Sequence, residues 1–173
     1  MFGLLVNMAL LTIWVLLLYL FKRRLTIILL GVAVGIVPVS LLSILVELCL
    51  LKIPLTIQVS SIVVAPIVEE TSKFLFIFLS AWKSRTILSK VRIFGAAEGV
   101  GFAYFENLGF ITNVMDVLLR SFSSWPLHMI EALILSYSVQ NTLTTKRNII
   151  LTVGYFLIAI IIHTLFNMIL FWI

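Results

Sequence analysis

The sequence has few charged residues and almost no cysteine. Of its 173 residues, 11% are charged and 62% are hydrophobic, whereas a soluble domain is typically about a quarter charged and about half apolar. This composition excludes a soluble globular protein and indicates an all-α, polytopic membrane protein. The single cysteine, Cys49, excludes an intrachain disulfide. The net charge of +5 comes from short basic runs between apolar segments, so it indicates membrane orientation and no nucleic-acid partner.

The apolar residues form long runs, and no polar stretch between them is long enough to fold separately. Because a helix of roughly 20 apolar residues crosses a bilayer, we predict one transmembrane domain over residues 1–173, built as a bundle of about six transmembrane helices. The predicted helices run approximately over residues 2–21, 25–50, 55–82, 93–113, 125–143 and 148–172. The stretch SSWPLH (123–128) predicts the start of the fifth helix, with Ser123 or Ser124 as the cap and Pro126 in the first turn.

The basic residues are concentrated in alternate loops. The first, third and fifth loops hold nine of the twelve, which are Lys22, Arg23, Arg24, Lys83, Arg85, Lys90, Arg92, Lys146 and Arg147. The positive-inside rule places these loops in the cytoplasm. We therefore predict a multi-pass protein of the cell membrane, surrounded by the lipid bilayer, with both termini outside the cytoplasm.

Most acidic residues lie inside the apolar runs. Five of the seven are Glu69, Glu70, Glu98, Glu106 and Glu131. A charged side chain at the bilayer centre costs about 2.5–3.5 kcal/mol, so these groups must be paired, protonated or in contact with a water-filled space. The sequence therefore predicts a polar cavity within the membrane, and intramembrane ionisable residues are candidates for function.

Two adjacent acids and a lysine share the third predicted helix. Lys73 is four residues from Glu69 and three from Glu70, so either pair can meet on one helix face. The two carboxylates point about 100° apart. We expect Lys73 to hold one acid while the other exchanges protons with water, and the sequence leaves open which acid does which.

Both histidines also fall inside predicted helices. His163 has Asn167 one turn away on the same face, and His128 shares a face with Glu131. An imidazole can act as a general base, an oxyanion donor or a metal ligand. The sequence has no H-E-x-x-H run, so no metal and no other cofactor is predicted, with zinc left as an open alternative.

The fourth predicted helix is rich in small residues. Gly95, Gly99 and Gly101 lie in the stretch FGAAEGVGFAYFENLGF, together with several alanines. Small residues let helix backbones approach closely in lipid, so this helix is expected to pack tightly against its neighbours. Packing accounts for the glycines, but it does not account for Glu106 and Asn107 on the same helix.

Four short motifs resemble those of the PrsW family of intramembrane proteases, within the superfamily of type II CAAX prenyl endopeptidases and CPBP proteins. They are EETSK (69–73), GFAYFEN (101–107), PLH (126–128) and HTLFN (163–167). The resemblance implies a helical fold in which glutamates and histidines line a cavity. It also implies that a glutamate activates water for peptide hydrolysis while His and Asn stabilise the oxyanion. By motif, the catalytic residues implied are Glu69, Glu70, His128, His163 and Asn167, with Lys73, Phe102, Glu106 and Asn107 in support.

One difference from the CAAX branch of the superfamily bears on the type of reaction. The CAAX branch has the pattern F-x-x-x-H, whereas here Phe102 is followed by Glu106. This argues against prenyl-protein processing and agrees with PrsW. Counted from the helix ends at about 1.5 Å per residue, Glu106, His163 and Asn167 fall in the outer half of the membrane, so the site is expected to open to the outside.

The leading hypothesis is therefore a glutamate-type intramembrane endopeptidase. Its predicted substrate is a membrane-anchored protein, such as the anti-sigma factors that PrsW-type proteases cut, or a membrane peptide. A non-catalytic scaffold of the same superfamily and a proton-coupled transporter are the alternatives, because acid and histidine chains also build proton relays. The short loops are equally compatible with a homo-oligomer.

Overall fold

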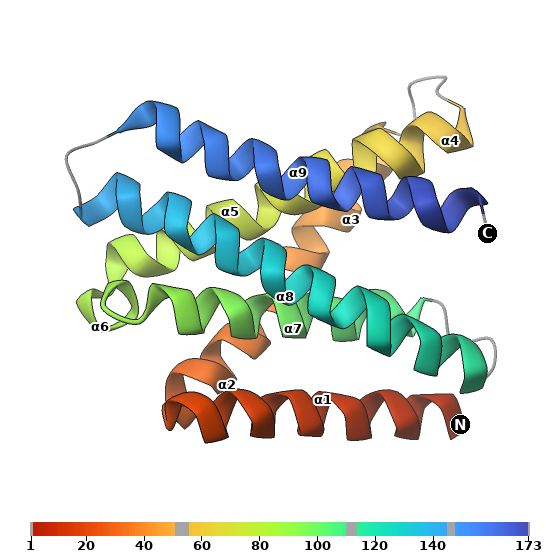
Figure 1. The fold of residues 1–173 in the computed structure, drawn as a ribbon, viewed down its shortest axis with the longest axis horizontal. Coiled ribbons are helices and arrows are strands. Elements are labelled where there is room, and N and C mark those ends of the chain that lie inside the picture. The colour runs from red at the N-terminus through yellow and green to blue at the C-terminus, as the bar shows by residue number, and fades with distance from the viewer. Residues whose placement is uncertain (1, 51–55, 110–113, 145–147, 173) are drawn as a thin grey trace.

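The computed structural model describes residues 2–50, 56–109, 114–144 and 148–172, and within them it contains helices and no strands. The helices form six passes, which confirms the predicted all-α bundle (Figure 1). The passes are α1 (Phe2–Lys22); α2 (Leu25–Val34), η1 (Gly35–Val39) and α3 (Ser40–Leu50); α4 (Ile57–Val59), η2 (Ser60–Val64) and α5 (Ala65–Lys83); α7 (Val91–Leu108); α8 (Val114–Thr144); and α9 (Ile149–Trp172). A short helix, α6 (Arg85–Leu88), joins α5 to α7.

Both chain ends lie at one end of the bundle, as an even number of passes requires (Figure 1). Within the described residues, three passes are long and apolar enough to cross a membrane by themselves, namely Gly3–Lys22, Leu25–Leu50 and Ile149–Leu170. The other three passes contain the intramembrane acids. They owe their lower apolarity to polar side chains that the fold buries, including Glu70, Lys73 and Glu131 at 0% exposure.

Two passes contain a π-helical segment. In η1, Pro38 lacks a backbone N–H, and the hydroxyl of Ser40 donates to Gly35 O at 2.8 Å. Proline is tolerated inside membrane helices when nearby side chains satisfy the freed carbonyls. The second segment, η2, ends at Val64, immediately before the helix that contains Glu69 and Glu70. The widened turn therefore helps to set the orientation of these two acids.

The helix α7 packs closely against α2 and α8 through its glycines. A Cβ at Gly99 would overlap the backbone carbonyl of His128, and a Cβ at Gly101 would overlap the carbonyl of Val32. The predicted close-packing face is confirmed. The contact at Gly99 also fixes how near α7 lies to the backbone of one of the candidate catalytic histidines.

Replacing Gly99 with alanine is expected to destabilise the protein by about 1–3 kcal/mol, because the added methyl group forces α7 away from α8. The matched control is Gly154→Ala, since a Cβ at Gly154 meets nothing within 4 Å. The control should be neutral or slightly stabilising, because alanine favours the helix. Thermal unfolding in the same detergent compares the two variants, and equal midpoints would contradict the packing argument.

The predicted start of the fifth helix is wrong. The helix begins at Val114, so Pro126 lies inside it and not in its first turn. Ser124 also lies within the helix, and its hydroxyl donates to Glu106 Oε2 at 3.0 Å. A proline favours the first turn because its missing N–H costs nothing there, but a long membrane helix packed on both sides accommodates it internally. The basic residues Lys146 and Arg147 lie outside the described residues.

Candidate active site

Lys73 lies at the centre of a buried polar cluster built from α5, α7, α8 and α9. Its ammonium group is within 2.6 Å of Glu70 Oε1, 2.9 Å of His128 Nδ1 and 3.4 Å of Glu131 Oε2. A lysine ammonium has three hydrogens to donate, and here each has one acceptor. All four residues are at most 1% exposed. The lysine therefore supplies the positive charge that makes the buried carboxylates tolerable.

Glu70 orients the second histidine. His163 Nδ1 lies 2.8 Å from Glu70 Oε1, the same oxygen that accepts from Lys73. This contact fixes the rotation of the imidazole ring and turns His163 Nε2 towards Glu69 Oε2, 3.6 Å away. The predicted catalytic residues Glu69 and Glu70 of α5 thus lie next to His163 of α9. Glu70 contacts one ring nitrogen of His163, and Glu69 lies near the other.

Glu131 joins the two histidines, and it was not among the predicted site residues. Its Oε2 lies 3.1 Å from His128 Nδ1 and 3.5 Å from His163 Nδ1. The spacing of three residues between His128 and Glu131 did indicate a shared helix face. Sequence alone could not show that α9 brings His163 to the same carboxylate, because that contact is between residues 32 positions apart.

The other nitrogen of His128 faces the predicted supporting residues of α7. His128 Nε2 lies 2.8 Å from Glu106 Oε2, which also accepts from Ser124, and Arg120 lies 3.8 Å from Glu106 Oε1. The ring of Phe102 packs edge-on against His128, with centroids 5.1 Å apart, and Lys73 Nζ lies 4.4 Å from the Phe102 centroid. Phe102 therefore forms an apolar wall beside the cluster and adds a cation–π contact to Lys73.

Glu69 differs from Glu70 in lining an open cavity. Two cavities, of about 440 and 210 Å³, share Glu47, Glu69 and Glu106 among their lining residues; together we call them the outer pocket. Oε2 of each of the two acids lacks a hydrogen-bond partner among the described residues, so the cavity is what distinguishes Glu69. The outer pocket is lined by residues of α3 and of the C-terminal half of α7. The C-terminal ends of these two helices lie at the end of the bundle that holds both chain termini (Figure 1). One of the paired glutamates is thus committed to the cluster, and the other faces space that water and substrate can enter.

The two predicted asparagines have different surroundings. Asn167 lines the outer pocket, and its Nδ2 donates to Ser61 O in η2 at 3.0 Å. One of the two amide hydrogens is used in this bond, and among the described residues the other has no acceptor. Asn107 is buried, and neither of its side-chain polar atoms has a hydrogen-bond partner within the described part of the chain. It does not join the Lys73 cluster.

The cluster contains the donor types of a zinc site. Glu70, His128, Glu131 and His163 each offer one ligand atom, and the four atoms lie within 4.8 Å of one another. Imidazole and carboxylate are both zinc ligands in proteins. However, the ammonium of Lys73 already donates to three of these residues. A metal ion would be repelled by this charge and would compete for the same acceptors, so the residues as arranged do not fit a metal.

The comparison with known protein families gives one match. Residues 21–173 match the family described as "PrsW family intramembrane metalloprotease". The chain belongs to the PrsW family. No curated protein and no solved structure matches it. PrsW membership identifies a membrane protein and supports a peptidase in general, which agrees with the resemblance of the four motifs. The family's description names a metalloprotease, whereas in this chain Lys73 occupies the centre of the cluster that offers metal ligands.

Proposed function

We propose that this protein is a PrsW-type intramembrane endopeptidase in which Glu69 is the general base. The proposal rests on the different surroundings of the two adjacent acids, Glu69 and Glu70. Glu70 is fully buried and its Oε1 is bonded to Lys73 and His163, whereas Glu69 lines the outer pocket. A general base must reach the water whose proton it takes, and Glu69 is the acid with that access.

In the first step, Glu69 removes a proton from a water molecule in the outer pocket as the water oxygen attacks the carbonyl carbon of the substrate peptide bond. The C–O bond forms, and the carbonyl π electrons move onto oxygen to give a tetrahedral oxyanion. In the second step, the C–N bond breaks and Glu69 transfers its proton to the leaving amine. The products are a carboxylic acid and an amine, and Glu69 returns to its starting form.

His163 and Asn167 are placed to stabilise the oxyanion. His163 is held at Nδ1 by Glu70, so in its doubly protonated form it presents Nε2–H beside Glu69. Asn167 lines the same pocket, and we assign its second amide hydrogen to the oxyanion. Donors aimed at a developing oxyanion contribute about 3–4 kcal/mol each in well-studied hydrolases.

The remaining residues position these groups. Lys73 balances the charges of Glu70 and Glu131, and Lys73 at Nδ1 and Glu106 at Nε2 hold His128 from two sides. Both ring nitrogens of His128 are occupied by these partners, so we assign His128 a positioning role. No step in this mechanism passes through a metal ion.

The contacts support a protease over the scaffold and the transporter. A scaffold has no need for histidines next to glutamates, yet both histidines lie within hydrogen-bonding distance of a glutamate here. A transporter needs a polar path to both faces, but neither carboxylate oxygen of Glu98 has a hydrogen-bond partner among the described residues, so the hydrogen-bonded chain stops before it. The outer pocket opens at the end predicted to lie outside, which suits a membrane-anchored protein cut near its outer end.

The experiment that tests the function is a comparison of membrane-protein fragments from cells that express either the wild type or Glu69→Gln. We expect at least one fragment that is present only with the wild type, and its new terminus identifies the bond cut. Glu98→Gln is the matched control, because it neutralises a buried acid that lies outside the proposed mechanism. Identical fragment sets in all three strains would refute the protease proposal.

A further inference from the structure

A second cavity lies at the end of the bundle opposite the outer pocket. It has a volume of about 560 Å³ and is bounded by α1, the start of α7 and the middle and end of α8. Arg92 in this cavity and Glu106 in the outer pocket are on the same helix, 14 residues apart in the sequence, which corresponds to about 21 Å along the axis. The cavity is therefore separate from the proposed catalytic site.

The rim of this cavity is basic. Lys22, Lys90 and Arg92 line it, and its described lining residues include no acid. Arg92 is held in place by Tyr137, because its Nη1 donates to the tyrosine hydroxyl at 3.3 Å and its guanidinium lies 5.2 Å from the ring centroid. Arg92 therefore points at a fixed place on the rim, where its charge is available to an anion that enters the cavity.

The inner wall of the cavity is apolar. Leu18, Met129 and Leu133 line it and are partly buried, whereas the basic Lys22 and Arg92 are exposed, and the lining residue Phe21 is 80% exposed. Tyrosine and basic side chains above an apolar wall are the arrangement found where a membrane protein meets the headgroup region. An occupant of this cavity must therefore carry negative charge at one end and hydrocarbon at the other.

We propose that this cavity binds one anionic phospholipid. The phosphate contacts Lys22, Lys90 and Arg92, and the first part of the acyl chains lies against Leu18, Met129 and Leu133. Basic pockets between transmembrane helices are suited to acidic lipid headgroups, since the charge attraction adds to the burial of the chains. This assignment holds whether or not the protein cleaves peptides.

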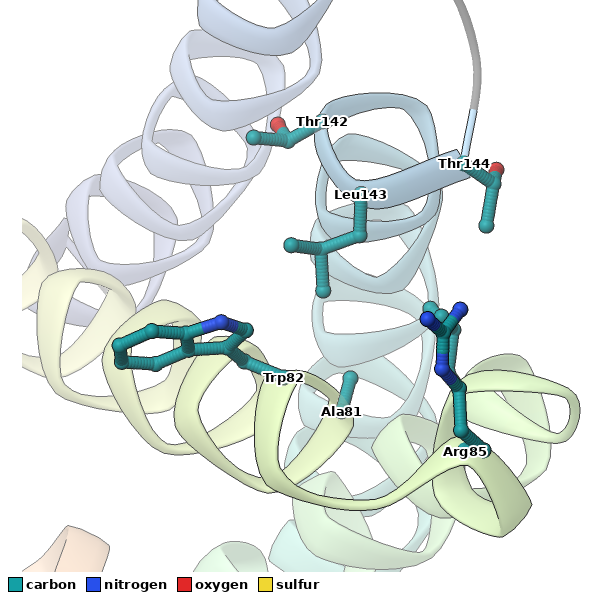
Figure 2. Close-up of a pocket in the computed structure, with 7 residues that line it drawn as sticks. Ala81, Trp82, Arg85, Thr142, Leu143 and Thr144 are labelled. Atoms are coloured by element: carbon teal, nitrogen blue, oxygen red, sulfur yellow. The ribbon is translucent and has the colours of Figure 1, made fainter.

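A neighbouring cavity at the same end provides the comparison. It has a volume of about 390 Å³ and is lined by Ala81, Trp82, Arg85, Leu88, Thr142, Leu143 and Thr144 (Figure 2). Among these described lining residues, Arg85 is the only basic one. Figure 2 shows Arg85 on one side of this cavity and Trp82 on the other. Arg85→Gln thus removes a basic charge from the same membrane surface without touching the proposed lipid site.

The test is native mass spectrometry of the whole protein with phosphatidylglycerol, cardiolipin or phosphatidylcholine. We expect the wild type and Arg85→Gln to bind the two anionic lipids at least tenfold more tightly than phosphatidylcholine. Each of Lys22→Gln, Lys90→Gln and Arg92→Gln should weaken anionic binding about fivefold, and the triple variant should lose the preference. The single variants keep the test valid even where the triple variant does not fold.

Three results would overturn the proposal. The first is a wild type with equal affinity for the three lipids. The second is a loss of preference in Arg85→Gln as large as in Arg92→Gln, which would indicate attraction to the basic surface as a whole. The third is full competition by soluble glycerol phosphate at the lipid's own concentration, because the apolar wall would then contribute nothing and the ligand would be a free phosphate.

Discussion

Replacing Glu69 with glutamine should lower the rate of peptide hydrolysis by about 10²–10⁴-fold, the usual contribution of a general base. Glutamine has nearly the same shape and cannot accept the proton of the attacking water. The fold should be unchanged, because Glu69 Oε2 makes no hydrogen bond within the described residues. The measurement is the cleavage rate of purified protein in lipid vesicles, with a substrate taken from the fragment comparison.

The control for this variant is Glu98→Gln, which should cleave at close to the wild-type rate. Glu70→Gln should also lose activity, but with a loss of stability, because Glu70 is a charge partner of Lys73 and the group that holds His163. A Glu69→Gln protein that cleaved at the wild-type rate would remove Glu69 from the mechanism. A Glu69→Gln protein as unstable as Glu70→Gln would contradict the assignment of catalysis to Glu69 and of a structural role to Glu70.

Replacing Lys73 with methionine should destabilise the protein by about 3–5 kcal/mol. The substitution keeps much of the length of the side chain but removes the cation between two buried carboxylates, and an uncompensated buried charge is costly. Lys73 Nζ also donates to His128, so the histidines should lose their positions and the activity should fall with the stability. Chemical or thermal unfolding in a fixed detergent measures the first effect, and the vesicle cleavage assay measures the second.

The double variant Lys73→Met/Glu70→Gln separates charge balance from packing. It should recover part of the lost stability, because one of the two unpaired carboxylates is gone. It should stay inactive, because a neutral amide at position 70 cannot hold His163 as a carboxylate does. If the double variant were as unstable as Lys73→Met, the cost would come from lost packing around the lysine stem and not from charge.

The bundle could be predicted from the sequence because membrane helices need long apolar runs and little else. The glycines of α7 likewise indicated a close-packing face, and the structure shows which backbones they meet, those of α8 and α2. The start of α8 could not be predicted, because Pro126 satisfies the rules for a first turn and for an interior position of a long packed helix alike.

The candidate site could be predicted in part. Charges that lipid cannot tolerate pointed to Glu69, Glu70 and Lys73, and each of the three lies at or beside the polar cluster. The roles of the two acids depend on which one faces the outer pocket, and that follows from the rotation of α5 in the bundle. Glu131 was missed as a site residue for the same reason, since its contact with His163 depends on how α8 packs against α9.

The central claim is that Glu69 activates water beside a cluster whose cation is Lys73. The most direct test is the cleavage rate of purified wild-type protein after treatment with a strong chelator, with the zinc content measured on the same sample. We predict an unchanged rate at well under one metal ion per chain, and no cleavage by Glu69→Gln prepared in the same way. Loss of wild-type activity on chelation, restored by added zinc, would contradict the account.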